Sequence, residues 1–362
     1  MILSQFTEEL RLLLKSNAYF STTHNILYVA TPKVACTSLK WWLADLVGCG
    51  DKILNANVSF ESDPELVIHD TFHQVVQQMT GFNATGLDLA LTSSEYFKFC
   101  VVRNPFKRVF SAWQSKWLLH EPLQKSASHG TAFSDRSIET ADDLRENFED
   151  FIENLMRCKD VGIDDVHLMP QSELLRPDLI NYNCIAKIED LGVLKNSLST
   201  HLGIDYSDPF AKVHWNVSFL PYLTFFFSEN AVKSILDIYA ADFELFGYEK
   251  TLPAGRNKFN KEEVELAIRA VKLLRGRNQR IGELTHRIVN NAPEKLFVCD
   301  GHLSNDLIEV ADLFKQNIVK RDLALAHQHH QLQQMREELL RAEAQIDLLK
   351  DVLLNRIYSD CF

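Results

Sequence analysis

The most clearly patterned stretch near the start of the chain is the segment 26–46. It opens with the short apolar run 26–30, Ile-Leu-Tyr-Val-Ala, which is typical of a buried parallel strand. Thr31-Pro32 ends this strand, because proline has no N–H for a sheet ladder and disfavours helix in the residue before it. From Thr37 onward the apolar residues recur at helical spacing, at Leu39, Trp42, Leu43 and Leu46. The pattern predicts a strand, a tight loop and a helix.

The loop of this predicted unit carries residues suited to an anion. Lys33 lies in the loop, and Thr37 and Ser38 lie where the helix begins. A helix N-terminus presents unpaired backbone N–H groups and the positive end of the helix dipole. A lysine and two hydroxyls at that point can bind a phosphate or a sulfate. The alternative is an ordinary strand-to-helix connection with an exposed lysine.

A second patterned stretch lies about 70 residues further along the chain. The run Phe99–Val102 predicts a buried strand, Asn104-Pro105 breaks it, and a helix begins near the proline. Arg103 then lies at the end of the strand, and Ser111 lies about two helical turns later. An arginine offers a bidentate fork to phosphate and a serine adds a hydroxyl, so this unit is a second candidate anion site. A basic helix start that is paired with acidic residues is the alternative.

Two histidines between these stretches are candidates for acid–base chemistry. Leu66-Val67-Ile68 predicts a short strand that ends at His69, and active sites of open α/β sheets lie beyond the carboxyl ends of strands. His73 lies one turn further if 71–79 is helical. Histidine is the usual general base near neutral pH, so His69 is the first choice and His73 the second. Either histidine can instead be exposed or hydrogen-bonded to the backbone.

The remaining elements before residue 250 are predicted from apolar spacing. The segments 5–16, 148–159 and 229–248 predict helices. In the segment 184–191, Lys187 and Glu189 are expected to form a structural ion pair.

The last third of the chain has a different pattern. Leu252–Gly255 indicates a linker, and 260–291 predicts a strongly basic helix. A heptad of apolar residues then predicts a coiled coil, with the alternative of one long amphipathic helix folded back: Ile318, Leu325, Leu332, Leu339, Ile346 and Leu353. We therefore expect a catalytic domain at 1–250, a helical linker region at 251–317 and a coiled coil at 318–357 that joins copies of the chain.

Composition narrows the classes of function. The net charge of −11 makes nucleic-acid binding an unsuitable role, although the basic helix could touch an anionic membrane surface. No apolar run approaches the roughly 20 residues of a membrane helix, and the first residues lack the basic region of a signal peptide. The seven cysteines show no paired spacing, which predicts neither disulfides nor a metal site. These features predict a cytoplasmic protein.

Five motifs resemble those of one enzyme family, the carbohydrate (membrane-type, family 2) sulfotransferases. Residues 31–37, Thr-Pro-Lys-Val-Ala-Cys-Thr, resemble the family's 5′-phosphosulfate loop, usually Pro-Lys-x-Gly-x-Thr, with Ala35 in place of the glycine. Residues 102–112, Val-Arg-Asn-Pro-Phe-Lys-Arg-Val-Phe-Ser-Ala, resemble its 3′-phosphate site. Residues 167–171 are similar to its His/Trp-x-x-Pro-Gln segment, and 239–248 to the motif that closes its catalytic domain. Residues 184–191 look like the family's third core strand entering a helix. The resemblance spans roughly residues 24–250.

This resemblance implies an α/β fold with a P-loop-like parallel sheet flanked by helices. It implies transfer of a sulfuryl group from 3′-phosphoadenosine 5′-phosphosulfate (PAPS) to a hydroxyl of a carbohydrate or glycoconjugate, with 3′,5′-adenosine diphosphate as the product and no metal. Lys33 and His69 (or His73) would be catalytic and His167 would face the substrate. The cofactor would contact Lys33, Val34, Ala35, Cys36, Thr37, Ser38, Arg103 and Ser111.

Two other functions fit parts of the pattern. A nucleotide kinase also uses a strand–loop–helix phosphate site, but the chain lacks the Gly-Lys-Ser/Thr ending of the usual P-loop and an obvious acidic ligand for magnesium. A non-catalytic coiled-coil scaffold with a sulfotransferase-like domain is the other alternative. The sequence names neither the acceptor nor the number of chains in an oligomer.

Overall fold

The computed structural model describes residues 8–55, 66–120, 136–160, 162–203 and 220–291, together with 341, 345 and 346. The chain divides into two compact units, Met1–Asn260 and Lys261–Phe362. The predicted coiled coil at 318–357 lies almost wholly outside the described residues and stays a prediction.

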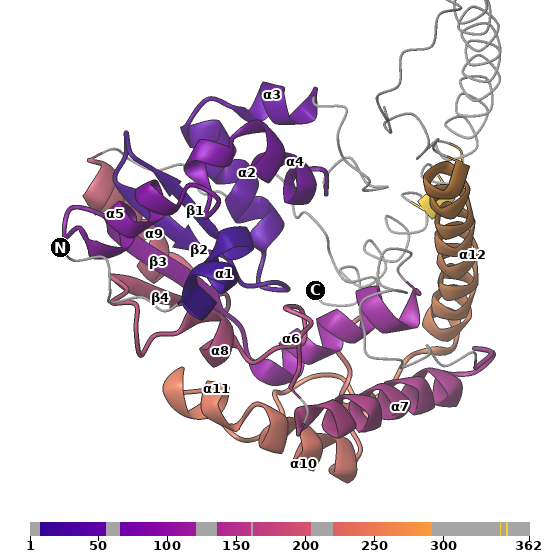
Figure 1. Ribbon diagram of the computed structural model, residues 1–362. Coiled ribbons are helices and arrows are strands. Elements are labelled where there is room, and N and C mark those ends of the chain that lie inside the picture. The colour runs from indigo at the N-terminus through magenta and orange to yellow at the C-terminus, as the bar shows by residue number, and fades with distance from the viewer. Residues whose placement is uncertain are drawn as a thin grey trace, which may run out of the picture. The chain divides into compact units, whose positions relative to one another are not determined.

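The first unit is built on a four-stranded sheet with the order β1 (Ala18–Ser21), β2 (Ile26–Val29), β3 (Phe97–Val102) and β4 (Cys184–Lys187) (Figure 1). Strands β2, β3 and β4 are parallel, as predicted, but β1 pairs antiparallel with β2. The sheet is therefore mixed rather than wholly parallel. The sequence pattern did not reveal β1, because all four of its residues are buried and so show no alternation of apolar and polar positions.

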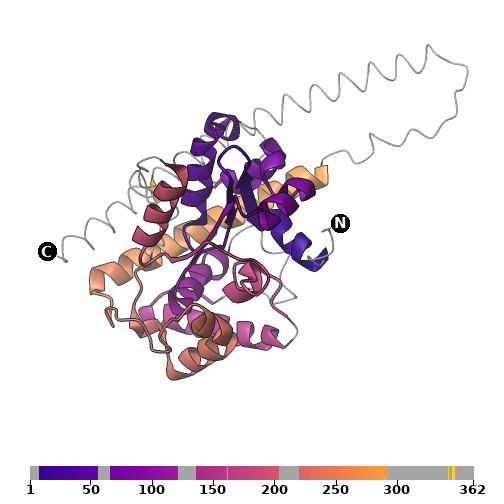
Figure 2. The same cartoon turned by 90° about the vertical axis from the view of Figure 1, so that its left-hand side faces the viewer.

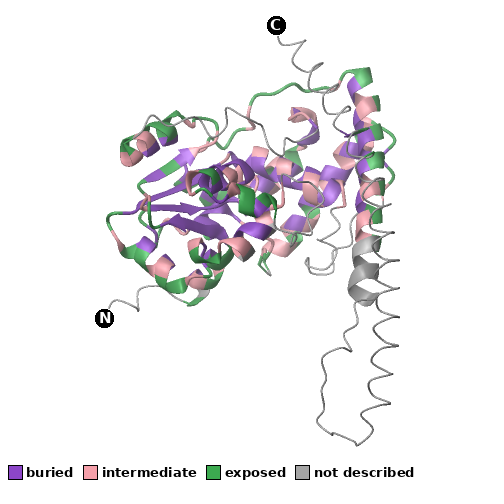
Figure 3. Cartoon of the chain, turned by 90° about the horizontal axis from the view of Figure 1, so that it is seen from above, coloured by how far each residue is buried: buried purple, intermediate pink, exposed green. Residues whose placement is uncertain are grey.

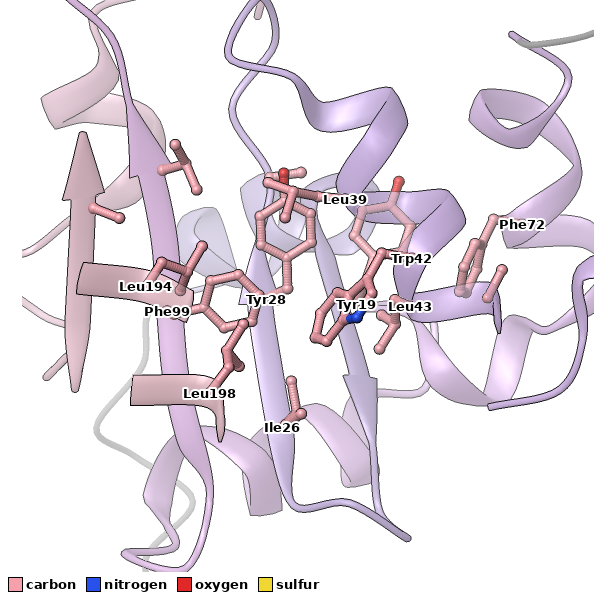
Figure 4. Close-up of a cluster of buried hydrophobic side chains, with 14 of the residues drawn as sticks. Tyr19, Ile26, Tyr28, Leu39, Trp42, Leu43, Phe72, Phe99, Leu194 and Leu198 are labelled. Carbon is pink, nitrogen blue, oxygen red and sulfur yellow. The ribbon is translucent and has the colours of Figure 1, made fainter. Parts of the chain in front are cut away.

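Helices cover both faces of the sheet, because successive side chains of a strand point to opposite faces. Ile26 and Tyr28 of β2 pack with α2 (Cys36–Leu46), α3 (Gly50–Leu54), α4 (Ile68–Val75) and α9 (Gly192–Leu202) (Figure 4). Leu27 and Val29 pack on the other face with α1 (Glu8–Asn17), α5 (Ala84–Thr92) and α8 (Gln171–Leu175). The sheet lies between these two groups of helices, as Figures 1 and 2 show from two directions.

A further group of helices follows β3 and carries its own aromatic core. Phe110 of α6 and the adjoining Trp113 pack against Phe148 of α7, and all three side chains are buried. The longest helix of this group is α7 (Ala141–Lys159). The shorter elements are α6 (Pro105–Ala112), the π-helical turn η2 (Trp113–Leu118), η4 (Thr224–Phe226), α10 (Glu229–Ile238) and α11 (Ala240–Leu245). The strands β1, β2 and β3 are buried throughout, and Figure 3 shows burial concentrated in the sheet and on the helix sides that face it.

Two local predictions are wrong. Leu66–Ile68 is not a strand, because α4 begins at Ile68 and is followed by the short 3-10 helix η1 (Gln77–Met79). Ile68 and Phe72 lie four residues apart, are both fully buried and so form one helix face, which a three-residue apolar run does not distinguish from a strand. His69 therefore lies in the first turn of a helix.

The expected ion pair between Lys187 and Glu189 does not form either. Lys187 Nζ donates to the carbonyl of Gly247 at 2.9 Å, whereas Glu189 accepts hydrogen bonds from the backbone N–H of Asn104 and the hydroxyl of Tyr248. The reason is that each side chain has another partner: Lys187 binds near the end of the predicted catalytic domain, and Glu189 binds both there and in the turn after β3.

The described part of the second unit is dominated by α12 (Lys261–Asn291). Glu262 and Glu263 lie in its first turn, where negative charge complements the helix dipole. The basic helix predicted at 260–291 is thus confirmed as a helix. Among the described residues, no helix is long and apolar enough to span a membrane.

Candidate active site

The loop between β2 and α2 has a backbone shape suited to an anion. Lys33 and Ala35 have φ angles of 69° and 59°, in the left-handed region, while Val34 between them keeps a negative φ and is fully buried. Alternating backbone signs of this kind turn successive N–H groups toward one point and form a concave anion site. The residues predicted to hold the 5′-phosphosulfate thus share one loop and one helix start.

The beginning of α2 is left open for a ligand. No side chain caps the helix, and its first turn contains no acidic residue. Thr37 and Ser38 in that first turn are buried, so their hydroxyls are held in place by the surrounding structure. An anion bound there would accept from the unpaired backbone N–H groups of the first turn and from these hydroxyls. The local structure therefore fits a 5′-phosphate.

Arg103 lies directly after β3 and reaches the neighbouring loop. Its Nη1 donates to the carbonyl of Lys33 at 3.1 Å, and its backbone is held on both sides by the amide of Gln171. Within the described residues the guanidinium forms no salt bridge, so most of its N–H donors remain available for phosphate. Burial lowers the pKa of Arg103, and the charge of Glu189 opposes this. Ser111 lies two turns along α6, half-buried.

Arg108 joins three parts of the site. Its side chain is buried, with 2% exposed, and donates from Nε to the carbonyl of Pro32 at 3.1 Å. Its Nη1 and Nη2 donate to the carbonyls of Met169 and Val166 at 2.8 and 3.1 Å. One guanidinium therefore connects the phosphate loop, α6 and the segment that carries His167. From sequence Arg108 was a member of a motif with no role, because carbonyl acceptors leave no signal in a sequence.

His167 forms a pair with Asp165 in this segment. Its Nδ1 lies 2.8 Å from Oδ1 of Asp165, which also accepts from the backbone N–H of His167. Burial and the charge of Lys116 lower the pKa of His167 to about 4, against the opposing effect of Asp165. Burial raises the pKa of Asp165, but the hydrogen bond and charge of His167 outweigh it, and the pKa falls to about 2. At neutral pH the pair consists of a neutral imidazole and a carboxylate.

His69 contacts the start of α2 with both ring nitrogens. Its Nε2 lies 3.0 Å from Oγ1 of Thr37, and its Nδ1 lies 2.9 Å from Nζ of Lys40. Burial lowers the pKa of His69 far below its ordinary value, and the charges of Lys40, His167, Lys116 and Lys33 act in the same direction. The structure thus brings His69, His167 and Lys33 into one cationic neighbourhood.

His73, the second choice for the base, lies apart from these contacts. Its Nε2 lies 2.9 Å from the hydroxyl of Tyr19, and its Nδ1 is buried with no hydrogen-bond partner among the described residues. Burial and the charge of Lys40 lower the pKa of His73 to about 4. The described residues contain no cluster of His, Cys, Asp and Glu that could hold a metal ion.

Comparison with known proteins finds relatives among the carbohydrate sulfotransferases. Carbohydrate sulfotransferase 10 of Xenopus laevis is 29% identical over 249 residues, which cover 64% of this chain and 67% of the relative. Carbohydrate sulfotransferase 10 of Mus musculus is 28% identical over 244 residues, 63% of this chain and 65% of the relative. Carbohydrate sulfotransferase 12 of Xenopus laevis is 26% identical over 250 residues, 63% of this chain and 59% of the relative.

The chain thus spans about two thirds or less of the length of these relatives. No solved structure matches it. The model of the Sulfotransferase family matches residues 16–249, which is more than half of the chain and includes every candidate site residue named above. The chain therefore belongs to the sulfotransferase family.

Proposed function

We propose that this protein transfers a sulfuryl group from PAPS to a hydroxyl of a carbohydrate or glycoconjugate. Family membership and the names of the relatives support this reaction. The observation that carries it is the hydrogen bond from Arg103 Nη1 to the carbonyl of Lys33, at 3.1 Å. It joins two anion sites from separate strands, and PAPS carries two anionic groups, a 5′-phosphosulfate and a 3′-phosphate.

Each of these two sites binds one anionic group of the cofactor. When bound, PAPS supplies the activated sulfuryl group. The backbone N–H groups of 34–38 and the hydroxyls of Thr37 and Ser38 hold the 5′-phosphosulfate, and Arg103 and Ser111 hold the 3′-phosphate. Lys33 neutralises the charge that develops on the bridging oxygen. Positioning and electrostatics then supply most of the rate, as in phosphoryl transfer.

The surrounding acidic groups are placed so that they do not compete for these cations. Glu189, the acid whose charge acts on Arg103, accepts from the backbone N–H of Asn104 at 3.1 Å and from the hydroxyl of Tyr248 at 3.0 Å. Asp242 accepts from the backbone N–H groups of Gln171 and Ser172 at 2.8 and 2.7 Å. Both carboxylates are satisfied without a direct bond to Arg103, which leaves its fork for phosphate.

Calorimetric titration with 3′,5′-adenosine diphosphate, beside ATP with magnesium, tests this function. We expect the diphosphate to bind and Arg103→Ala to weaken binding by about 2–5 kcal/mol, because a charge partner of phosphate is removed. Arg157→Ala is the matched control, since the Arg157 side chain is 74% exposed and its ion pair within the described residues is with Glu153 of the same helix. Binding of ATP alone would favour a kinase. Binding of neither nucleotide would leave a non-catalytic scaffold and overturn the proposal.

We also propose that the heptads of 318–357 form a coiled coil that joins copies of this chain in the cytoplasm. Sedimentation equilibrium of the whole chain tests the association. We expect a mass that is a multiple of 41.6 kDa, and Leu332→Asp together with Leu339→Asp should return it to a single chain, because charges enter the apolar seam. A wild-type chain that sediments as a monomer contradicts the coiled coil.

A further inference from the structure

We propose that His167, oriented by Asp165, is the general base of the reaction and that His69 positions Thr37 against the 5′-phosphate of the cofactor. From sequence the role of base falls to His69. The hydrogen bonds around the two rings favour the opposite division, and this inference rests on the proposed function.

The partners of His69 decide which of its nitrogens carries a proton. A lysine ammonium has donors only, so Nδ1 of His69 must accept from Nζ of Lys40 at 2.9 Å. In the neutral ring the proton then lies on Nε2, which donates to Oγ1 of Thr37 at 3.0 Å. A protonated Nε2 cannot take the proton of an acceptor hydroxyl. His69 is therefore unsuited to act as the base while Lys40 is charged.

The same contacts give His69 another task. Once Oγ1 of Thr37 accepts from His69, the hydroxyl hydrogen of Thr37 is directed elsewhere, toward the anion site at the start of α2. Lys40, His69 and Thr37 thus form a chain of donors that ends on that anion. Lys40 is buried, and its ammonium also lies 4.8 Å from the centre of the Tyr19 ring, which fixes its place. His69 is a positioning residue in this arrangement.

The partner of His167 has the opposite effect. A carboxylate only accepts hydrogen bonds, so Nδ1 of His167 carries the proton that it donates to Asp165 at 2.8 Å. Nε2 then holds a lone pair, and no partner contacts it within the described part of the chain. A histidine with one nitrogen hydrogen-bonded to a carboxylate and the other nitrogen free to accept a proton is the usual arrangement of a general base.

Arg108 places this imidazole beside the cofactor loop. Its guanidinium binds the carbonyl of Pro32, which precedes Lys33, and the carbonyl of Val166, which precedes His167. The charge of Lys33 acts on both His167 and His69, as expected if the three side chains share one site. The hydroxyl of Tyr239 also donates to the carbonyl of Leu168 at 2.7 Å, which holds the His167 segment from its other side. The base is thus fixed close to Lys33 by the protein alone.

The transfer step balances with these groups. The acceptor oxygen forms the new bond to sulfur, and its proton passes to Nε2 of His167, whose imidazolium is then paired with the carboxylate of Asp165. The bond between sulfur and the bridging oxygen breaks, and its electron pair stays on the 5′-phosphate of the product, next to Lys33. No oxidant, metal or further reactant is needed.

Variants of the whole chain separate the two roles. The readouts are the Kd of 3′,5′-adenosine diphosphate and the release of sulfate from PAPS, with water as the hydroxyl acceptor. We expect His167→Gln to keep the Kd within about twofold and to lose at least about 100-fold in turnover, because only the base is removed. We expect His69→Ala to weaken the binding of 3′,5′-adenosine diphosphate about tenfold, because the hydroxyl of Thr37 loses the hydrogen bond that links it to the charged Lys40 through His69.

The conservative variant His69→Gln sharpens the test. A glutamine can accept from Lys40 and donate to Thr37, so it should restore most of the binding and turnover that His69→Ala loses, whereas a glutamine can never act as a base. His201→Gln is the matched control, because among the described residues the hydrogen bonds of the His201 ring go to the carbonyls of His24 and Asn25, away from His69 and His167. If His69→Gln abolishes turnover and His167→Gln keeps it, the proposal is overturned.

A second measurement decides the question without any turnover. Long-range proton–nitrogen NMR of the chain labelled with 15N-histidine identifies the protonated nitrogen of each ring, and the glutamine variants assign the signals. We expect the proton on Nε2 of His69 and on Nδ1 of His167. The opposite tautomers would overturn the inference even if the nucleotide binds. Loss of nucleotide binding with the expected tautomers would instead overturn the proposed function.

Discussion

At the scale of single residues, Ala35 stores strain in the loop between β2 and α2. Its φ of 59° lies in the left-handed region, which costs a residue with a Cβ about 1–2 kcal/mol. The family motif usually has glycine at this position, and the φ angle explains why: glycine adopts it at no steric cost. The chain departs from the motif but keeps the loop shape that the motif requires.

Replacement of Ala35 by glycine should therefore stabilise the protein. We expect a gain of about 0.5–1 kcal/mol in the free energy of unfolding, which is the relieved strain minus the larger unfolded-state entropy of glycine. Urea denaturation measures it. Ala44→Gly, within α2, is the matched control and should destabilise by about 1 kcal/mol or more. If the two variants lose stability equally, Ala35 carries no strain.

At the scale of elements, Arg103 and Arg108 lie on one short segment but act on different properties. Arg103 directly follows β3 and is half-buried, and its Nη1 donates to the carbonyl of Lys33. The proposed function assigns its other N–H donors to phosphate. Arg108 lies on α6 and is buried, and its guanidinium donates to one carbonyl of the loop after β2 and to two carbonyls of the segment that carries His167. The motif therefore combines Arg108, which is structural, with Arg103, to which the proposed function assigns phosphate binding.

Substitution of each arginine by lysine should separate these properties. The three donors of a lysine all radiate from one nitrogen, so they cannot reach the three carbonyls that Nε, Nη1 and Nη2 of Arg108 bind. Arg108→Lys should therefore cost about 2–4 kcal/mol of unfolding free energy through the lost hydrogen bonds and unsatisfied carbonyls. Arg103→Lys should leave stability within about 0.5 kcal/mol and weaken the binding of 3′,5′-adenosine diphosphate. Urea denaturation and calorimetry of both variants check this. Equal stability losses would contradict the distinction.

The elements that could be predicted from sequence are those with a local signal. The strands β2 and β3 are apolar runs ended by proline-containing turns, and α6 begins at that proline, so their places follow from the chain itself. β1 and the first turn of α4 have no such signal, because β1 is buried throughout and Ile68 needs Phe72 to define a helix face. The Asp165–His167 pair and the role of Arg108 depend on distant carbonyls and charges.

At the scale of the whole molecule, an acidic protein contains a locally cationic site. The net charge is −11, yet Lys33, Lys40 and Lys116 all act on His69. A surface region of one sign of charge raises the local concentration of an oppositely charged ligand. The same cations and the burial of the rings keep His69, His73 and His167 uncharged well below the ordinary histidine pKa.

Because these three buried histidines are neutral in the folded chain, the free energy of unfolding should fall as the pH is lowered. The pKa of His73 is lowered to about 4 in the folded chain, while in the unfolded chain it lies near 6.5. Below about pH 6.5 the unfolded chain binds the proton first, so this contribution is fully present above pH 6.5 and is lost as pH falls toward 4. His69 and His167 act in the same direction. The free energy of unfolding should therefore decline steadily between pH 6.5 and pH 4.

The variant His73→Gln removes the contribution of one histidine to this pH dependence of the free energy of unfolding. Each such group contributes up to about 1.4 kcal/mol per pH unit within its window, so the slope of the variant between pH 6 and pH 4.5 should be shallower than that of the wild type by about 1 kcal/mol per unit. Urea denaturation at several pH values measures both slopes. The variant also loses the bond to Tyr19, which shifts its curve at every pH without changing the slope. Parallel curves would show that His73 takes up its proton as readily in the folded chain as in the unfolded one.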